Sequence, residues 1–329
     1  MKTKIVYILV SSSDDIYLEQ AYVSMYSVKY YMPDAHIFLL MDRQTEMSLT
    51  SVRSGGLKYV DEVISVDVEK DYSPQQRSRI LKTSVRKYVE GDFLFIDTDT
   101  IVTKPLYKID FMKSDLAACW DTHAPFLENP YRNMCIEHGK RLGWPIEKEK
   151  VYFNTGVIYV KDNEYTHKFY ELWNMNWLEG CKKGVNMDQP SFAQTNYMFG
   201  HPVQTLDDVW NCELKHGIRF LKDAKIVHYL CTNVSKGDDK QIFVLNERRT
   251  FEDMLESDLE IPALVKEIVI DPFQGLSSVT QLFSGNDLLF FRSELFSLLY
   301  RFKDSLVFAG LDRLIKECKN MLKNVLRKR

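Results

Sequence analysis

The sequence predicts an α/β fold with a doubly wound, mainly parallel sheet and a helical C-terminal extension. Short apolar runs rich in β-branched residues alternate with helical stretches over residues 4–230, which is the pattern of consecutive βαβ units. The first runs are continuous in apolar character, as expected for strands covered on both faces. From residue 286 onward the pattern is helical. We therefore expect one large domain over residues 1–240 and a helical C-terminal region over residues 241–329.

The first four predicted strands lie at residues 5–10, 37–41, 62–66 and 93–96. Because a helical stretch separates each run from the next, right-handed crossovers would place these strands in parallel. The clearest helix start precedes the fourth run. There Pro74 suits the first helical position, and Ser73 can form a capping box with Gln76.

The second half of the predicted domain continues with strands and helices. Predicted strands lie at residues 116–120 and 152–160, the latter interrupted at 154–156, and at 218–221 and 225–229. A helix is predicted over residues 164–178, and a short one opens at residues 186–190.

Two aspartates follow the fourth predicted strand. Asp97 and Asp99 are one residue apart, so in an extended chain their side chains point the same way. Open α/β sheets bind ligands at the C-terminal ends of their strands, and two carboxylates there suit a divalent cation that could hold a diphosphate. The alternative is that the pair merely ends a strand and solvates a turn. Against it, the apolar Ile101 and Val102 follow at once.

Composition and motifs exclude several functions. A net charge of −3, from 43 basic and 46 acidic residues, gives no overall attraction to nucleic acid. The six cysteines show no CxxC pair and no close His/Cys cluster, which argues against a zinc site or a disulfide framework and favours a reducing, cytoplasmic compartment. No GxGxxG or GxxxxGK[ST] follows the first strand. No apolar run approaches the length of a membrane span.

Five segments together point to a known family. They are residues 95–102 with the aspartate pair, 153–157 (Phe-Asn-Thr-Gly-Val), 188–189 (Asp-Gln), 210–211 (Trp-Asn) and 226–229 (Ile-Val-His-Tyr). In their identity and order the sequence resembles GT-A fold glycosyltransferases, particularly glycosyltransferase family eight, which includes glycogenin and lipopolysaccharide galactosyltransferases. The resemblance covers roughly residues 4–230.

The resemblance implies a GT-A type fold and a metal-dependent glycosyltransferase. Such an enzyme would move a hexose from a nucleotide-diphosphate sugar, here expected to be a UDP-sugar, to a glycan or lipid-linked acceptor with retention of configuration. It implies that Asp97, Asp99 and His228 hold Mn²⁺ or Mg²⁺. Two carboxylates and one imidazole would leave room on the metal for two phosphate oxygens and so neutralise the departing diphosphate.

The resemblance also implies residues that bind the nucleotide. The base and ribose should lie against the exit of the first strand, near Ser11, Ser13 and Tyr17, with Asp42 as a further candidate. Asp97 would reach the diphosphate through the metal. Lys236 would replace a family lysine that binds phosphate, although the Pro-Trp that follows that lysine in the family is missing here.

A basic helix and three later residues are expected to face the donor sugar. Arg79 or Lys82 resembles the family's basic residue at the nucleotide sugar, whereas the alternative is a solvated basic helix face. Asn154, Asp188 and Gln189 match positions that touch the sugar, and either Gln189 or Asp188 would stabilise an oxocarbenium-like centre. The alternative for Asp188 is that it simply caps a helix.

The C-terminal segment, residues 311–329, is predicted to be an amphipathic helix. Its apolar residues recur at three-and-four spacing and are Leu311, Leu314, Ile315, Cys318, Met321, Leu322, Val325 and Leu326. Residues 313–329 include seven basic residues and one acidic residue. Such a helix suits an anionic bilayer, so we expect peripheral attachment to the inner membrane face. The alternative is a helix packed on the domain with a solvated basic side.

Two other functions compete with the transferase interpretation. Haloacid-dehalogenase phosphatases also place two aspartates after a strand, with the first as nucleophile; here that would be Asp97, with Asp207 and Asp208 as the later acidic motif. However, their motif usually sits on the first strand and continues with Thr or Val where Ile101 stands. The other alternative is a catalytically inactive sugar-nucleotide-binding module, against which the intact metal motif argues.

Overall fold

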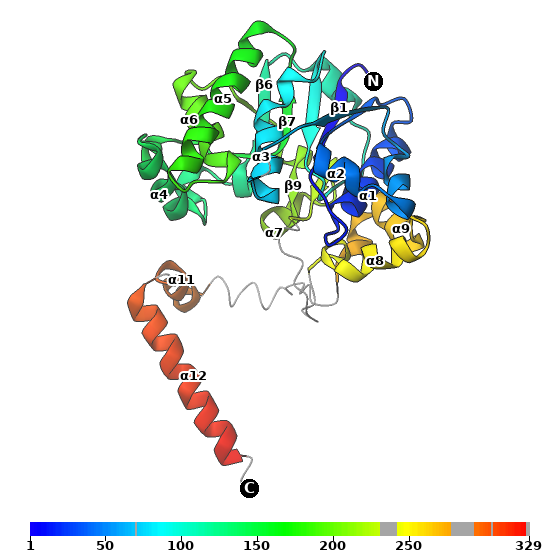
Figure 1. Cartoon of the computed structure of the whole chain (residues 1–329). Coiled ribbons are helices and arrows are strands. Elements are labelled where there is room, and N and C mark those ends of the chain that lie inside the picture. The colour runs from blue at the N-terminus through cyan, green and yellow to red at the C-terminus, as the bar shows by residue number, and fades with distance from the viewer. Residues whose placement is uncertain (70, 231–241, 278–292, 304, 327–329) are drawn as a thin grey trace. The chain divides into compact units, whose positions relative to one another are not determined.

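The computed structural model describes residues 1–69, 71–230, 242–277, 293–303 and 305–326, with side chains given as far as residue 318. The chain divides into two compact units, Met1–Val279 and Thr280–Arg329 (Figure 1). The first unit contains the sheets, and the second is helical.

The first unit is built on a seven-stranded sheet with strand order β3-β2-β1-β4-β7-β6-β8. These strands are β1 Lys4–Leu9, β2 Ile37–Asp42, β3 Glu62–Val66, β4 Phe93–Ile96, β6 Leu116–Trp120, β7 Phe153–Val160 and β8 Gln204–Thr205. The first four in sequence are mutually parallel, as predicted. Strand β7 lies between β4 and β6 and runs antiparallel to both. The sheet is therefore doubly wound and mainly parallel, with one reversed strand near its middle.

A second, three-stranded sheet has the order β5-β10-β9. Its strands are β5 Thr100–Val102, β9 Cys212–Glu213 and β10 Ile226–His228. Strand β10 is antiparallel to β5, and this register places His228 opposite Thr100. The small sheet thereby brings His228 next to the turn that follows β4.

Two predictions about strands are wrong. Residues 218–221 are not a strand, because Ile218–Phe220 forms a 3₁₀ turn that continues the short helix α7, Leu214–Gly217. None of the three residues in that turn is buried, so they make no packing against a sheet that would favour an extended strand. The predicted interruption at 154–156 is also wrong, since β7 runs unbroken and all eight of its residues are buried.

Helices cover both faces of the large sheet. Besides α7, the α-helices described in this unit are α1 Tyr17–Tyr31, α2 Arg43–Ser48, α3 Pro74–Ser84, α4 Arg132–Leu142, α5 Glu164–Lys182, α6 Asp188–Met198, α8 Arg248–Glu256 and α9 Ala263–Ile270. Alternate residues of β1 enter two different cores. Tyr7 packs in one with Met25 of α1, and Val6 packs in the other with Leu81 of α3 and Trp173 of α5. The continuous apolar character of β1 follows from this two-sided burial.

Helix α3 begins at the predicted capping box. The Ser73 side chain accepts a hydrogen bond from the Gln76 backbone N–H at 3.3 Å, and Gln76 Oε1 accepts from the Ser73 N–H at 3.0 Å. Pro74 occupies the first turn. Arg79 and Lys82 of this helix line the cavity described below.

Helices α8 and α9 lie beside α1 (Figure 1). Their residues Phe251 and Val265 share a buried cluster with Tyr22 of α1 and Val227 of β10. The chain from residue 242 to residue 277 thus contributes to the core of the first unit.

The second unit contains α11, Glu294–Arg301, and α12, Leu306–Leu326. Its described apolar side chains are mostly exposed, including Leu298, Leu306 and Ile315. Among the residues that the structure describes, no helix combines the length and apolar character that crossing a bilayer requires.

Candidate functional site

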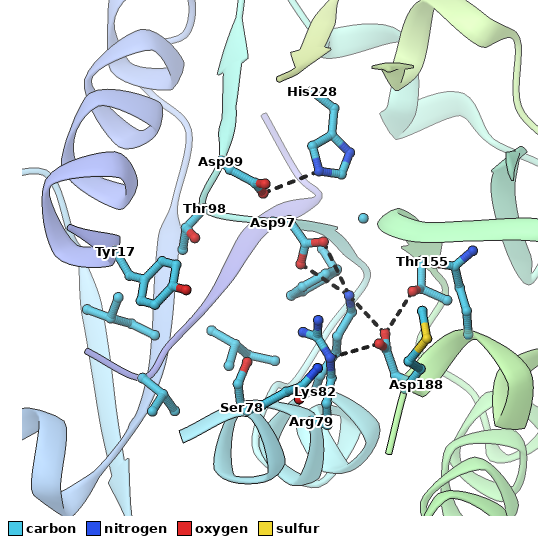
Figure 2. A pocket seen from close by; sticks show the side chains of 18 of the residues that line it. Tyr17, Ser78, Arg79, Lys82, Asp97, Thr98, Asp99, Thr155, Asp188 and His228 are labelled. Atoms are coloured by element: carbon cyan, nitrogen blue, oxygen red, sulfur yellow. Dashed lines mark hydrogen bonds and ion pairs between the residues drawn. The ribbon is translucent and has the colours of Figure 1, made fainter. Parts of the chain in front are cut away.

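A cavity of about 590 Å³ opens at the C-terminal ends of β1 and β4. This is where open α/β sheets place their ligands. Figure 2 shows the cavity with Tyr17 on one side and Asp188 on the other. Its lining residues with polar side chains include Tyr17, Gln20, Ser78, Arg79, Lys82, Asp97, Thr98, Asp99, Asn154, Asp188, Gln189 and His228.

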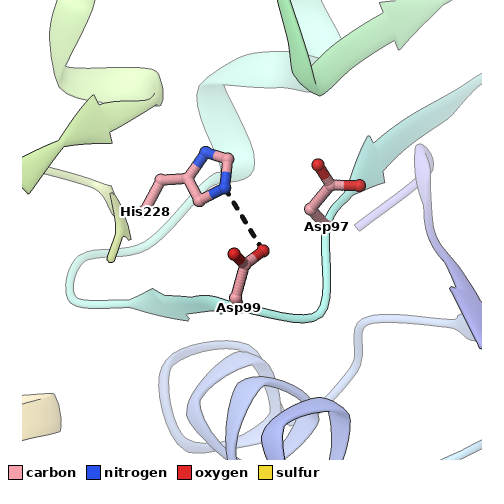
Figure 3. A group of neighbouring side chains, drawn as sticks. All are labelled: Asp97, Asp99 and His228. Carbon is pink, nitrogen blue, oxygen red and sulfur yellow. Dashed lines mark ion pairs between the residues drawn. The ribbon is translucent and has the colours of Figure 1, made fainter. Parts of the chain in front are cut away.

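Asp97, Asp99 and His228 converge at this cavity (Figure 3). One ligand atom from each lies within 4.8 Å of the others. The two aspartates flank a turn that joins β4 to β5, and the Asp97 backbone N–H donates to the Gly156 carbonyl at 2.8 Å. The structure therefore brings together the three side chains that the sequence analysis expected to share a cation.

The imidazole of His228 is buried and faces Asp99, with Nε2 at 3.2 Å from Asp99 Oδ1. Burial alone would lower the pKa of His228, but Asp99, with help from Asp97, raises it above its ordinary value. A divalent cation among these groups would replace the proton in balancing the two carboxylates. Two carboxylates and one imidazole are a donor set that Mn²⁺ accepts readily and that Mg²⁺ also tolerates.

Gly156 on β7 makes space for the His228 ring. A Cβ atom added at this glycine would lie 2.5 Å from His228 Cε1 and 2.8 Å from Nδ1. Both distances are shorter than van der Waals contact, so a larger residue would displace the ring. The glycine of the Phe-Asn-Thr-Gly-Val segment is thus required sterically by the histidine.

Two cations from α3 hold the Asp188 carboxylate. Arg79 Nε lies 2.8 Å from Asp188 Oδ1, Lys82 Nζ lies 3.1 Å from Oδ2, and the Thr155 hydroxyl donates to Oδ2 at 2.7 Å. Burial would raise the pKa of Asp188, but Arg79 and Lys82 together hold it well below its usual range. Lys82 also lies 3.1 Å from Asp97 Oδ1, so it bridges the two carboxylates.

These contacts exclude two alternative roles that the sequence left open. A solvated basic face on α3 is wrong for Lys82, which is 2 % exposed, and for Arg79, which lines the cavity. A helix-capping role for Asp188 is also wrong, because Asp188 is the first residue of α6 and the cap residue, Met187, makes no side-chain capping bond.

Asp121 is a site residue that the sequence analysis did not single out. Its Oδ1 accepts hydrogen bonds from Gln189 Nε2 at 2.9 Å and from Asn154 Nδ2 at 3.3 Å. Asp121 follows β6 directly, so the signal that identified Asp97, an acidic residue after a predicted strand, could have found it. Gln20 was missed as well; it is buried at the cavity, and its amide has no hydrogen-bond partner among the described residues.

Several residues that were predicted to contact the nucleotide are not among the lining residues of this cavity. The Ser11 hydroxyl donates to Asp15 at 2.6 Å, and Ser11 and the exposed Ser13 are not among the lining residues of the cavity. Asp42 caps α2 by accepting from the Thr45 N–H at 2.8 Å, and it is also ion-paired with Arg77. Tyr17 does line the cavity. Lys236 lies outside the described residues.

Glu213 on β9 is a buried carboxyl group close to the site. Its Oε1 accepts a hydrogen bond from the Thr122 backbone N–H at 3.1 Å. Burial, together with the charge of Asp121, raises the pKa of Glu213 to about 8. Glu213 therefore carries a proton in the folded protein at neutral pH.

Comparison with known proteins identifies the family. The family model described as Glycosyl transferase family 8 matches residues 8–236. The chain belongs to glycosyl transferase family 8. The predicted family resemblance is confirmed, and this member of family 8 is a glycosyltransferase. A comparison with curated protein sequences finds no match.

Solved structures support the fold of this family 8 enzyme. The galactosyltransferase LgtC, in complex with donor and acceptor sugar analogs, aligns with a TM-score of 0.50 at 15% identity, covering 80% of this chain and 99% of LgtC. An active-site mutant of LgtC gives a TM-score of 0.51 at 14% identity, covering 82% and 100%. The predicted GT-A type fold is confirmed.

The geometry of this family 8 enzyme does not favour a phosphatase. In such an enzyme the later acidic motif would face the nucleophile, but Asp207 caps a 3₁₀ turn by accepting from the Val209 N–H. Asp208 instead contacts His123 Nδ1 at 2.9 Å. Neither residue is among the lining residues of the cavity that contains Asp97.

We expect Glu213→Gln to remove a pH dependence of stability. The folded pKa of about 8 lies above the reference value of 4.5, so between these values the unfolded chain releases a proton that the folded protein keeps. Wild-type stability should therefore fall as pH rises, by up to about 1.4 kcal/mol per pH unit. The Tm difference, Glu213→Gln minus wild type, should grow steadily from about pH 5 to about pH 8.

Thermal unfolding followed by circular dichroism measures this difference. Glu171→Gln, at an exposed position of α5, is the matched control and should follow the wild type at every pH. A Tm difference for Glu213→Gln that stays constant with pH would contradict the raised pKa.

Proposed function

We propose that this glycosyltransferase moves a hexose from a UDP-sugar to a glycan or lipid-linked acceptor with retention of configuration. We further propose that Asp97, Asp99 and His228 bind Mn²⁺ or Mg²⁺ for this reaction. The observation that carries the proposal is the convergence of these three side chains within 4.8 Å at a cavity that also presents Arg79 and Lys82. A site with both carboxylates and cations suits a cation together with a diphosphate.

Different residues of the cavity would bind the metal and contact the donor diphosphate. A metal bound by the three ligands would supply positive charge against the leaving diphosphate. Asp97 and Asp99 supply hard oxygen ligands, and the imidazole of His228 supplies a third position from the other sheet. Arg79 keeps its Nε at Asp188, and its two Nη groups can then donate toward phosphate or hydroxyl groups of the donor.

Gln189 is the side chain that we assign beneath the anomeric carbon. Both oxygens of Asp188 already contact Arg79, Lys82 or Thr155, so Asp188 acts by holding those cations. Gln189 donates its Nε2 to Asp121, and its carbonyl oxygen Oε1 is then the atom that can stabilise positive charge at the sugar. Asn154 shares the same Asp121 oxygen and would contact the donor sugar beside Gln189.

The nucleoside would lie at the α1 side of the cavity. Tyr17 opens α1 and lines this end of the cavity, and its ring can stack on a base or contact a ribose. We keep Lys236 as a proposed phosphate ligand, since it follows His228 by eight positions. The uridine preference itself rests on the family resemblance.

Donor choice can be tested directly by thermal shift. The protein is heated with UDP-, GDP-, CMP- and dTDP-sugars, each with and without Mn²⁺. We expect the largest rise in Tm with a UDP-sugar plus Mn²⁺, because ligand and metal bind only the folded state. A rise confined to another nucleotide would overturn the UDP assignment.

Removing a metal ligand should abolish transfer. We expect Asp97→Ala and Asp99→Ala to lower the rate of UDP release from a UDP-sugar by at least about 100-fold, because the leaving diphosphate loses its electrostatic partner. Tm should change little. Asp223→Ala, which removes an exposed carboxylate paired with Lys104, is the matched control.

Two outcomes would contradict this assignment. One is full transferase activity of either variant in the presence of a chelator. The other is release of phosphate from a chromogenic phosphate ester by the wild type, without UDP release from any UDP-sugar, since this would favour the phosphatase alternative.

The Gly156→Ala variant tests the position of the His228 ring. Because the added Cβ would lie 2.5 Å from His228 Cε1, the imidazole must move, and we expect Mn²⁺ affinity in the presence of UDP to fall about tenfold or more. Electron paramagnetic resonance of free Mn²⁺ measures this affinity. Gly55→Ala is the matched control, because its Cβ would make only an ordinary 3.5 Å contact with Leu259. Equal Mn²⁺ affinity in the two variants would count against His228 as a ligand.

We also propose that the helical tail attaches the enzyme to an anionic membrane surface in the cytoplasm, where a lipid-linked acceptor would be available. In its support, Leu306, Leu311, Leu314 and Ile315 of α12 are all exposed, and seven basic residues fall within residues 313–329. An exposed apolar stripe beside basic residues fits the boundary of lipid headgroups and acyl chains. The described cysteines are all free thiols, which suits a reducing compartment.

Deleting residues 311–329 should weaken binding to anionic liposomes. Each basic residue near the headgroups contributes about 1 kcal/mol, so we expect binding to fall by several orders of magnitude, as measured by co-sedimentation. Neutral phosphatidylcholine liposomes are the control and should bind the full chain weakly. Unchanged binding of the shortened chain to anionic liposomes would rule out this attachment.

A further inference from the structure

Asn211 is a completely buried residue between Trp210 and β9. Both ends of its carboxamide make hydrogen bonds to residues of the proposed site. Its Oδ1 lies 3.0 Å from His228 Nδ1, and its Nδ2 lies 3.0 Å from Asn154 Oδ1. A single side chain thus connects the proposed metal ligand to the proposed sugar contact.

A backbone amide fixes the direction of both hydrogen bonds. The Gly156 N–H donates to Asn154 Oδ1 at 2.8 Å, and a backbone N–H can only donate. The Asn154 atom at this point is therefore the oxygen, so Asn211 must present its NH₂ group to it. The carbonyl oxygen of Asn211 then faces His228. Since this oxygen can only accept, Nδ1 of His228 carries the hydrogen.

The other ring nitrogen is thereby directed to the carboxylates. His228 Nε2 lies 3.2 Å from Asp99 Oδ1, inside the group of atoms that could hold a cation. We propose that Asn211 is a positioning residue that selects Nε2 of His228 as the metal-facing nitrogen and, through its other end, holds Asn154 for the donor sugar. This inference rests on the proposed metal site and adds a residue that acts through His228 and Asn154.

The hydrogen bonds continue beyond Asn154 to Gln189. Asn154 Nδ2 donates to Asp121 Oδ1 at 3.3 Å, and Gln189 Nε2 donates to the same oxygen at 2.9 Å. Asn129 Nδ2 binds the other oxygen of Asp121 at 2.8 Å. The chain from His228 to Gln189 is therefore continuous. Buried chains of this kind hold each member in one orientation, because a reversed amide would oppose two acceptors or two donors.

Two substitutions at Asn211 separate its two ends. Asn211→Leu removes both hydrogen bonds at similar volume, and we expect Mn²⁺ affinity in the presence of UDP to fall about 10- to 100-fold. Asn211→Asp keeps an acceptor for His228 Nδ1, but it replaces the NH₂ group that donates to Asn154 with an oxygen, so two acceptor oxygens then face each other. We expect its Mn²⁺ affinity to stay within about threefold of wild type while the transfer rate at saturating metal falls about tenfold or more.

Electron paramagnetic resonance measures Mn²⁺ binding, and UDP release measures transfer. Asn176→Leu is the matched control; it removes the hydrogen bond from Asn176 Nδ2 on α5 to Thr195 Oγ1 on α6, at 2.9 Å, and should leave both quantities unchanged. A merely structural role for Asn211 would lower the Tm of both Asn211 variants without separating metal affinity from transfer rate.

The wild type provides a second test that does not depend on an Asn211 variant that folds. Protein labelled with ¹⁵N-histidine is loaded with diamagnetic Mg²⁺ and UDP, and the His228 signals are assigned by their absence in His228→Gln. We expect a hydrogen on Nδ1 and none on Nε2, the nitrogen that would face the Mg²⁺. The reverse assignment would overturn the inference.

The outcomes distinguish this inference from the proposed function. If Asn211→Leu binds Mn²⁺ as tightly as wild type, the inference is wrong and the metal site stands. If the wild type binds no Mn²⁺ with UDP, both are wrong. Reduced Mn²⁺ affinity in Asn211→Leu together with retained affinity in Asn211→Asp supports the inference.

Discussion

The site depends on balancing three carboxylates that share one cavity. Asp97, Asp99 and Asp188 would repel one another in a partly dry environment, and each is held by a cationic or protonatable partner. Lys82 lies 3.1 Å from both Asp97 and Asp188, and His228 lies 3.2 Å from Asp99. The partners come from different elements: Lys82 from α3 and His228 from β10. The three carboxylates therefore acquire their partners only when α3 and β10 are both packed in the folded domain.

Much of the fold could be predicted from sequence because its signals are local. The runs that become β1, β2 and β4 are apolar and buried on both faces, and the capping box at Ser73 marks the start of α3. The reversed direction of β7 could not be predicted, since a buried strand has the same composition whichever way it runs. The error at residues 218–221 has a similar origin, because a run of that length does not distinguish a strand from a 3₁₀ turn.

The candidate site was only partly predictable for the same reason. The spacing of Asp97 and Asp99 is local, whereas the place of His228 depends on the pairing of β10 with β5 and was expected only from the family resemblance. The position of Asp121 directly after a predicted strand was a local signal, whereas the role of Asn211 depends on side-chain contacts between distant segments, which no spacing in the sequence encodes. The contact of Ser11 with the nucleotide stays a prediction; its hydroxyl donates to Asp15, a bond within the same turn that the sequence pattern did not reveal.

The turn between β4 and β5 has a fixed length. At its first residue, Asp97 N–H is bonded to Gly156 of β7 in the large sheet, and at its last residue, the Asp99 carbonyl accepts from Tyr229 N–H just after β10 in the small sheet. A segment of three residues is thus hydrogen-bonded to one sheet at its start and to the other at its end. An inserted residue would break one of these hydrogen bonds and displace the carboxylate of Asp97 or Asp99. Surface loops generally tolerate insertions, but the turn between β4 and β5 cannot be lengthened without moving a proposed metal ligand.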